Sequence, residues 1–168
     1  MGMRPARVFL PIFLTEKTDS KNILLSVKML RALLEGLTLA NVAYLEVFPE
    51  TPSIYATNII VKGHKLPYLF KGAKYMPEMK SEDWLTIPFI IANGGGDCED
   101  LAAARAAELR RGGVKCHADI RIRWLANLGS WRAHAIVKFD DGSKRVEDPS
   151  ARLGMPTGGL PEHWGRGR

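Results

Sequence analysis

Three residues of this chain are best suited to chemistry: Cys98, His134 and Asp148. Cys98 follows the glycine-rich turn at 94–96 and opens an alanine-rich segment that predicts a helix. A helix N-terminus leaves backbone N–H groups unpaired and carries positive partial charge, so it stabilises a thiolate and then an oxyanion. We therefore expect Cys98 to ionise readily and to be a nucleophile that attacks carbonyl groups.

His134 and Asp148 are candidates for the base that activates this thiol and for the group that orients the base. His134 lies 36 residues after Cys98, and Asp148 lies 14 residues after His134. A single cysteine at a helix start is more often a small buried residue than a nucleophile. The order Cys, His, Asp, with each residue on a suitable element, favours a catalytic triad.

A predicted hairpin brings the histidine and the aspartate together. Residues 132–139 predict one strand, and residues 143–149 predict its return partner. A three-residue loop between them, with its glycine in the left-handed conformation, sets His134 opposite Asp148 within hydrogen-bonding reach. A two-residue turn at 141–142 is the alternative, and it shifts the register by one residue and moves Asp148 to the other face. The three-residue loop is favoured because it alone pairs the two side chains.

Three short blocks in this region resemble the transglutaminase-like cysteine superfamily. They are residues 96–102 (Gly-Asp-Cys-Glu-Asp-Leu-Ala), residues 131–135 (Trp-Arg-Ala-His-Ala) and residues 147–149 (Glu-Asp-Pro). The resemblance spans residues 81–155 and implies an α+β, papain-like fold in which a Cys-bearing helix packs on an antiparallel sheet that carries His and Asp. It also implies that Cys98 is the nucleophile, His134 the base and Asp148 the orienting residue. Compact members with such a cysteine block occur in bacterial and phage proteins.

The chemistry expected of this triad is attack on an amide or ester carbonyl, with a thioester acyl-enzyme as intermediate. Water as the acceptor gives a peptidase or amidase, and a lysine amine gives a transglutaminase; the sequence leaves the acceptor open. No cofactor or metal is expected, because the sequence has no calcium-type acidic loop. The competing hypothesis is a non-enzymatic structural or binding protein that keeps this fold, such as a phage assembly component.

An oxyanion hole needs a second donor beside the backbone N–H of Cys98. Three upstream side chains are candidates: Trp84, Tyr75 and Asn93. Each also fits a structural role, as a helix-packing aromatic, a loop anchor and a helix cap respectively. Trp131 and Arg132, which closely precede His134, are candidates for substrate contact. The acidic residues around Cys98 oppose thiolate formation, so a protonated His134 is needed to outweigh them.

Cys116 and His117 raise the question of a zinc site shared with Cys98 and His134. Zinc ligands usually come in close pairs such as C-x-x-C, and adjacent strand residues face opposite ways, so zinc is not favoured. Residues 114–124 alternate apolar and polar, which predicts a strand with Cys116 in the core and His117 exposed. With only two cysteines, both thiols are expected to be free in a reducing compartment.

The remaining segments predict the scaffold. Upstream of the cysteine we expect a strand at 7–14, a helix from Asp19-Ser20 to about Gly36, strands at 41–48 and 57–61, a loop over 63–80 near the cleft, and a helix that starts at 81–84 and is limited or kinked by Pro88. The helix that begins at Cys98 is expected to run to Arg111, with Asp97 as N-cap and Gly112-Gly113 as its stop.

Length and charge frame the function. The 168 residues predict one domain over 1–155 and a flexible tail over 156–168. No membrane span or signal peptide is recognisable, so we expect a cytoplasmic or virion-associated protein that acts on a protein or peptide and not on a membrane. The net charge of +6 is interpreted as a solvated basic face, with an acidic substrate or partner as the alternative and nucleic acid not favoured. The oligomeric state is open.

Overall fold

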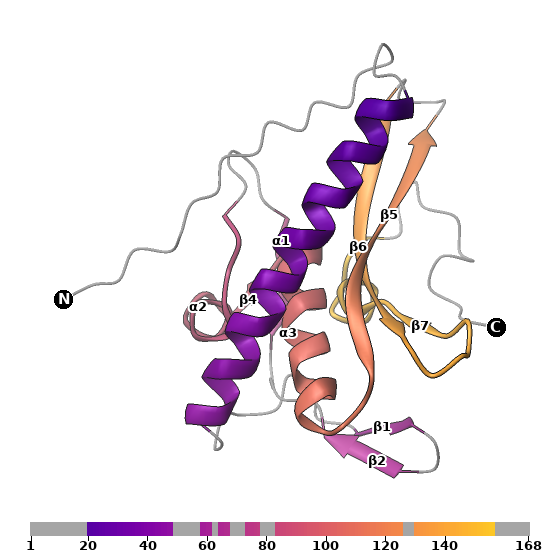
Figure 1. The fold of residues 1–168 in the computed structure, drawn as a ribbon. Helices are drawn as coiled ribbons and strands as arrows, with labels where there is room; N and C mark the ends of the chain where they lie inside the picture. Colours follow the sequence, from indigo (N-terminus) through magenta and orange to yellow (C-terminus); the bar gives the residue numbers. More distant parts are fainter. Residues whose placement is uncertain are drawn as a thin grey trace.

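The computed structural model describes residues 20–48, 58–61, 64–67, 73–77, 83–125 and 130–156. Its elements are α1 (Ser20–Val47), β1 (Asn58–Val61), β2 (His64–Pro67), β3 (Lys74–Tyr75), α2 (Ile87–Asn93), β4 (Gly95–Gly96), α3 (Cys98–Arg111), β5 (Cys116–Leu125), β6 (Ser130–Phe139), β7 (Val146–Glu147) and α4 (Pro149–Arg152). α3 packs against β5 and β6, and α1 packs against α3 and β5 (Figure 1). The predicted α+β class, with a small antiparallel sheet, is confirmed.

Helix α1 is longer than predicted. It continues to Val47 instead of ending near Gly36, so the prediction of a strand over 41–48 is wrong. From Leu30 to Leu45 the buried positions lie on one face of the helix: Leu30, Leu34, Leu37, Thr38, Asn41 and Leu45. This continuous buried face keeps the chain helical across Gly36 and across the β-branched and aromatic residues that follow it, although these residues have lower helix propensity.

The segment before the second helix holds more structure than the loop predicted over 63–80. β1 confirms the strand predicted near 57–61, and it pairs antiparallel with β2. β3 pairs in parallel with β4, so the backbone at Tyr75 lies beside Gly96, two residues before Cys98. Such two-residue strands have no sequence pattern of their own, because the pairing is long-range.

Helix α2 begins at Ile87, later than the predicted start at 81–84. Pro88 lies in its first turn and does not limit or kink it, because a proline there loses no intrahelical hydrogen bond. The helix ends at Asn93, and Gly94 caps it in the left-handed conformation with φ 77°. The glycine turn that follows leads directly into α3.

Helix α3 confirms the prediction for residues 98–111. Asp97 is its N-cap and forms a capping box with Asp100. Ten consecutive residues, from Asp100 to Leu109, are buried, so the helix is covered on all sides. Five of these ten positions are alanine, whose small side chain lets the neighbouring elements pack closely around the helix. The alanine-rich sequence therefore suits a central helix.

Strands β5 and β6 pair along their full length, from Cys116 opposite Phe139 to Leu125 opposite Ser130. The predicted core positions Cys116, Ala118 and Ile120 are buried, but Asp119, on the predicted polar face, is buried as well. His117 is partly exposed and bonds Asp140 at 2.8 Å.

The return strand is shorter than predicted, and its predicted register is wrong by two residues. β7 spans only Val146–Glu147, and Lys138 pairs with Val146, not with residue 144. The loop is longer because Asp141 accepts the Ser143 N–H at 3.0 Å and the Ser143 hydroxyl accepts the Arg145 N–H at 3.3 Å. The loop glycine, Gly142, has the predicted positive φ, 81°.

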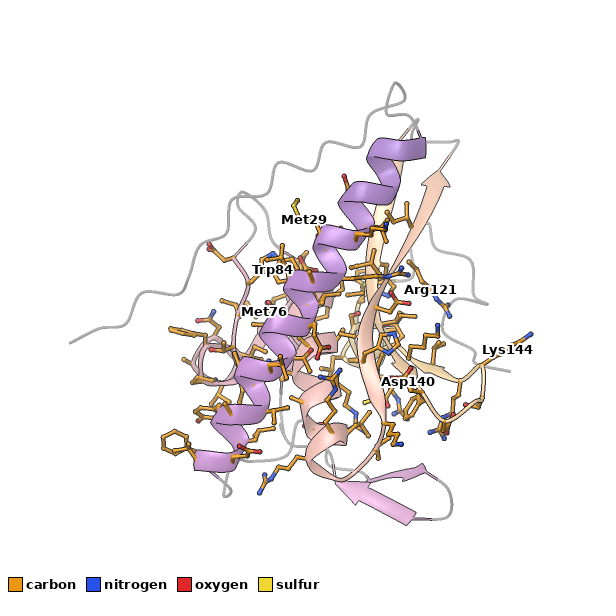
Figure 2. The ribbon with its side chains drawn as sticks, in the orientation of Figure 1. Met29, Met76, Trp84, Arg121, Asp140 and Lys144 are labelled. Carbon is orange, nitrogen blue, oxygen red and sulfur yellow. The ribbon has the colours of Figure 1, made fainter. Side chains whose placement is uncertain are left out.

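Basic side chains are distributed around the described surface. Arg121 on β5 and Lys144 in the β6–β7 connection point away from α1 (Figure 2). Arg110 instead forms a two-pronged ion pair with Glu35 of α1, at 2.6 and 2.7 Å. Within the described ranges, no helix has both the length and the apolar character needed to cross a membrane. The strand predicted at 7–14 and the tail beyond residue 156 lie outside the described residues.

Candidate active site

Cys98 lies at the junction of three parts of the fold. It is the first residue of α3, it is half-buried, and it packs against the core cluster that includes Trp84 and Ala135. Its Sγ donates a hydrogen bond to Oε2 of Glu99 at 2.9 Å. The backbone of Ala135, on β6, also hydrogen-bonds the thiol. The nucleophile candidate is therefore held between its own helix and the sheet.

The pKa of the Cys98 thiol is raised well above its ordinary value. Burial is the largest cause, followed by the negative charges of Glu99 and Asp97, whereas the hydrogen bond from Ala135 lowers the pKa. The expectation of a readily ionised thiol is wrong for the free protein. Desolvation and the adjacent carboxylates outweigh the favourable field of the helix N-terminus.

His134 and Asp148 form the predicted imidazole–carboxylate contact. Both are buried, and Nε2 of His134 lies 2.7 Å from Oδ2 of Asp148. Burial acts to raise the pKa of Asp148, but the hydrogen bond and charge of His134, with bonds from Ala151 and Ser150, lower it overall. An ionised carboxylate only accepts, so the Nε2 atom carries a proton and Nδ1 is the acceptor in the neutral ring.

The structure brings the cysteine close to the strand that carries the histidine. Ala135, which bonds the thiol through its backbone, directly follows His134 on β6. Among the described contacts, however, the side-chain partner of the thiol is Glu99 and not His134. A reaction through the His134 ring therefore requires the thiol to leave Glu99.

Of the oxyanion candidates, Trp84 belongs to the same core cluster as Cys98 and is only 7% exposed. Its Nε1 atom is buried, and within the described residues it has no hydrogen-bond partner. A buried indole N–H normally finds an acceptor, so this atom is a donor available to a bound group.

Tyr75 lies on β3, beside the glycine turn. Burial, then the charges of Cys98, Asp97 and Glu99, raise the pKa of its phenol to about 12. With this raised pKa the phenol stays protonated over the whole neutral range. The Tyr75 backbone N–H also donates to Leu153 at 2.9 Å, which ties β3 to the chain after α4.

Asn93, the third candidate, is exposed at the end of α2 and lines a pocket of about 300 Å³. Apolar side chains and acidic side chains share this pocket with glycine backbone: Met76, Pro77, Leu85, Gly95, Gly96, Asp97 and Asp100. The pocket lies against the turn that leads into Cys98. In the view of Figure 2, Met76 and Trp84 lie to the left of α1, and Arg121 and Asp140 lie to its right.

Asp100 holds the backbone around the cysteine. Its Oδ1 atom accepts the Leu85 N–H at 2.7 Å, and its Oδ2 atom accepts the Asp97 N–H at 3.3 Å. A Cβ on Gly96 would lie 2.7 Å from Oδ2 of Asp100, so only glycine fits this close approach. The two aspartates thus fix the turn and the segment at 83–86.

Trp131 and Arg132 lie on β6, where they pair in register with Trp124 and Arg123 of β5. The positions of their side chains lie outside the described part of the structure. Within the part that is described, no three His, Cys, Asp or Glu side chains converge as they would around a metal ion.

Two features of the site were missed by the sequence reasoning. The first is the Glu99 carboxylate as the direct partner of the thiol, which only the side-chain geometry reveals. The second is α4, a short helix whose N-cap is Asp148 and whose first residue is Pro149. An aspartate followed by proline is a signal for a helix start, and it could have predicted this turn.

No protein-family model, curated protein or solved structure shows significant similarity to this chain.

Proposed function

We propose that the protein is a cysteine-dependent acyl-transfer enzyme with a transglutaminase-like, papain-like fold, of the compact type found in bacteria and phages. The observation that supports this most strongly is the buried hydrogen bond of 2.7 Å between His134 and an ionised Asp148. His134 lies on β6, and the backbone of the same strand contacts Cys98. A buried imidazole that a carboxylate orients, one residue along β6 from the backbone that contacts a helix-terminal thiol, supports nucleophilic catalysis.

In the proposed reaction, the Cys98 thiol turns from Glu99 to His134 and transfers its proton to Nδ1. The sulfur attacks the carbonyl carbon of an amide or ester, and an S–C bond forms. The backbone N–H of Cys98 and the indole N–H of Trp84 are the proposed donors to the oxyanion. Collapse of the tetrahedral intermediate breaks the bond to the leaving amine, which takes the proton from the imidazolium.

The thioester then reacts with an acceptor. Water, deprotonated by His134, releases a carboxylic acid and returns the thiol, as in a peptidase or amidase. A lysine amine forms a new amide and returns the thiol, as in a transglutaminase. Asp148 keeps the same imidazole orientation in both half-reactions, because its carboxylate remains bonded to Nε2.

Acylation by p-nitrophenyl acetate tests the proposal without a known substrate. We expect one acetyl group on the peptide that contains Cys98, found by mass spectrometry, with release of one equivalent of nitrophenolate. His134→Ala should lose most of this acylation. Cys116→Ala changes a core cysteine away from the histidine and should retain the acylation. Acetylation at the same rate in wild type and His134→Ala would refute the proposed triad.

The fate of the acetyl group identifies the acceptor. The acetylated protein is incubated in buffer alone and in buffer with a primary diamine such as 1,5-diaminopentane. Release of acetate at a rate independent of diamine supports a hydrolase. Formation of acetyl-diamine, with faster loss of the acetyl group from Cys98, supports a transferase.

A non-enzymatic binding protein is the second candidate. The hydrogen bond from Cys98 to Glu99 and the raised pKa of the thiol favour it, because a resting thiol in this environment is a poor nucleophile. This candidate predicts that Cys98→Ala leaves the biological role intact. Loss of that role in Cys98→Ala, with unchanged thermal stability, would favour the enzyme.

A further inference from the structure

Arg121 is the cross-strand neighbour of His134. The two residues are directly opposite each other in the β5–β6 ladder, and residues in that relation have Cβ atoms about 5 Å apart. The Arg121 side chain is half-buried, and it points away from α1 (Figure 2). Among the residues that the structure describes, it has no hydrogen-bond or ion-pair partner. Arg121 is therefore a cation without a counter-ion, on the strand beside the proposed base.

The carboxylates next to Arg121 and His134 are already engaged. Asp119, two residues before Arg121 on β5, forms an ion pair with Arg31 of α1. Asp148 is bonded to His134 at 2.7 Å. A half-buried guanidinium has lost part of its hydration, and without a counter-ion this loss is not compensated. A ligand with a negative charge would supply the missing partner.

The same ladder carries two more arginines close to this position. Arg123 and Arg132 are opposite each other, two residues along from the pair of Arg121 and His134. Like charges that are directly opposite destabilise a strand pair, so a bound anion would stabilise this part of the sheet. The register therefore concentrates positive charge on both strands around the position of the imidazole.

We propose that Arg121 is a specificity-determining residue that binds a carboxylate of the substrate, namely an acidic side chain of a peptide, close to the carbonyl that is attacked. This inference rests on the acyl-transfer function proposed above. A guanidinium can donate two parallel N–H bonds to one carboxylate, which fixes both the position and the orientation of the substrate. The net charge of +6 also favours the approach of an acidic peptide.

The cross-strand relation sets the spacing between the two groups of the substrate. Arg121 extends from the strand beside His134, so the carboxylate that it binds lies within about two residues of the carbonyl presented to the base. A neutral substrate lacks this anchor. We therefore expect the discrimination to occur in substrate binding and not in the bond-breaking step.

Two esters that differ only in charge test the inference. Mono-p-nitrophenyl adipate carries a free carboxylate, and its methyl ester is the neutral match. The second-order rate constant for acylation of Cys98 by each ester is divided by that for N-acetylcysteine at the same pH. In wild type we expect the normalised constant to be about tenfold larger for the anionic ester, because a hydrogen-bonded ion pair contributes at least that factor. High salt should reduce this preference.

Substitutions of Arg121 separate its role from the general positive field. Arg121→Gln should abolish the difference between the two esters, and Arg121→Lys, which keeps the charge but not the planar fork, should retain part of it. Lys144→Gln is the matched control, because it removes one positive charge from an exposed position between β6 and β7 and should keep the wild-type ratio. Melting temperatures confirm that each variant is folded.

Direct binding decides the question if neither ester acylates Cys98. An acetylated peptide of three Gly-Glu repeats and its Gly-Gln counterpart are titrated while the NMR shifts of the β5 and β6 amides are followed. Only the acidic peptide should bind, and Arg121→Gln should lose this binding. Binding without acylation would support the carboxylate site and refute the acyl-transfer function, and absence of binding would overturn the inference.

Equal normalised constants for the two esters in wild type would overturn the role of Arg121, as would an anionic preference that persists in Arg121→Gln. If acylation depends on His134 but shows no charge preference, only the role of Arg121 fails and the proposed function stands. Hexathymidylate is titrated in the same way as the peptides. If it binds more tightly than the acidic peptide in an Arg121-dependent manner, the site takes nucleic acid and the inference of an acidic peptide is wrong.

Discussion

His134 and Asp148 lie 2.7 Å apart at Nε2 and Oδ2, although they are not opposite each other in the β6–β7 ladder. The contact depends on α4. Asp148 is the N-cap of this helix, and its Oδ1 atom accepts the Ser150 hydroxyl at 2.9 Å and the Ala151 N–H at 3.0 Å. One carboxylate oxygen is thereby fixed by α4, and the other is directed at the imidazole.

Asp148→Ala should lower the free energy of unfolding by about 2–3 kcal/mol at pH 7, because it removes a helix cap and a buried hydrogen bond to His134. Asp148→Asn, which retains an acceptor for the cap, should cost less. Urea unfolding measures both variants. Ser150→Ala is the matched control, with a loss of about 1 kcal/mol. An Asp148→Ala protein as stable as wild type would mean that this contact has no energetic role.

Acid should lower the free energy of unfolding by protonating Asp148. The folded-state pKa of Asp148 is lowered below its unfolded value of 3.8, so its stabilising contribution is present above that value and is lost as pH falls through the folded pKa. Urea unfolding between pH 5 and pH 2 should show a steep loss in wild type and a shallower loss in Asp148→Asn. If wild type and Asp148→Asn lost stability equally between pH 5 and pH 2, Asp148 would not be the residue responsible for acid sensitivity.

Glu108 should produce the opposite trend at higher pH. It shares the buried Arg105 with Glu147, and burial, against the effect of Arg105, raises its pKa from 4.5 to about 8. The folded protein then holds an extra proton, so stability should decline as pH rises from about 4.5 to about 8, by at most about 5 kcal/mol.

Glu108→Gln should flatten this decline when urea unfolding is measured at pH 5, 6, 7 and 8. Glu35→Gln is the matched control, because the hydrogen bond to Arg110 lowers the pKa of Glu35 and takes its titration out of this range. A Glu108→Gln protein that keeps the full wild-type slope would show that Glu108 is ionised throughout.

Two glycine substitutions should change stability in opposite directions. Gly96→Ala places a methyl group 2.7 Å from Oδ2 of Asp100 and should cost about 2–3 kcal/mol, because the capping box must shift. Gly36→Ala lies inside α1, where a Cβ meets nothing within 4 Å, and should add about 0.5–1 kcal/mol. Thermal or urea unfolding of the pair tests both signs, and a stable Gly96→Ala protein would contradict the close packing of the turn.

Trp84→Phe removes the indole N–H and retains an aromatic ring. If this group donates to the oxyanion, acylation of Cys98 by p-nitrophenyl acetate should slow about 100-fold. Alkylation by iodoacetamide, which forms no oxyanion, should change little and is the control reaction. Equal slowing of both reactions would indicate a packing role for Trp84 instead.

The sequence predicted the elements that have local signals. Asp97 and Gly112 mark the ends of α3, and the alternation in β5 identifies Cys116 as a core residue. The contact between His134 and Asp148 was predicted from a register that is wrong by two residues. It forms all the same, because β7 ends at Glu147 and Asp148, as the N-cap of α4, directs its carboxylate at the imidazole.

The sequence failed where tertiary contacts decide the structure. Residues 41–48 have strand-like composition, but burial of Asn41 and Leu45 against the rest of the fold keeps the chain helical as far as Val47. Asn41 accepts the Ile87 N–H at 2.8 Å, a bond between residues 46 positions apart that no local pattern reveals. The partnership of Cys98 with Glu99 was missed for a related reason, since side-chain rotamers depend on the packed environment.

The β3–β4 pairing, and the bond from Tyr75 to Leu153 across almost 80 residues, join the segments around Cys98. Such contacts have high sequence separation, and they form only after the loops between them have closed. A nascent chain that ends at residue 140 already contains the thiol, but it lacks both Asp148 and the Leu153 carbonyl. The contacts that hold the surroundings of the cysteine are therefore completed only after residue 153 has been synthesised.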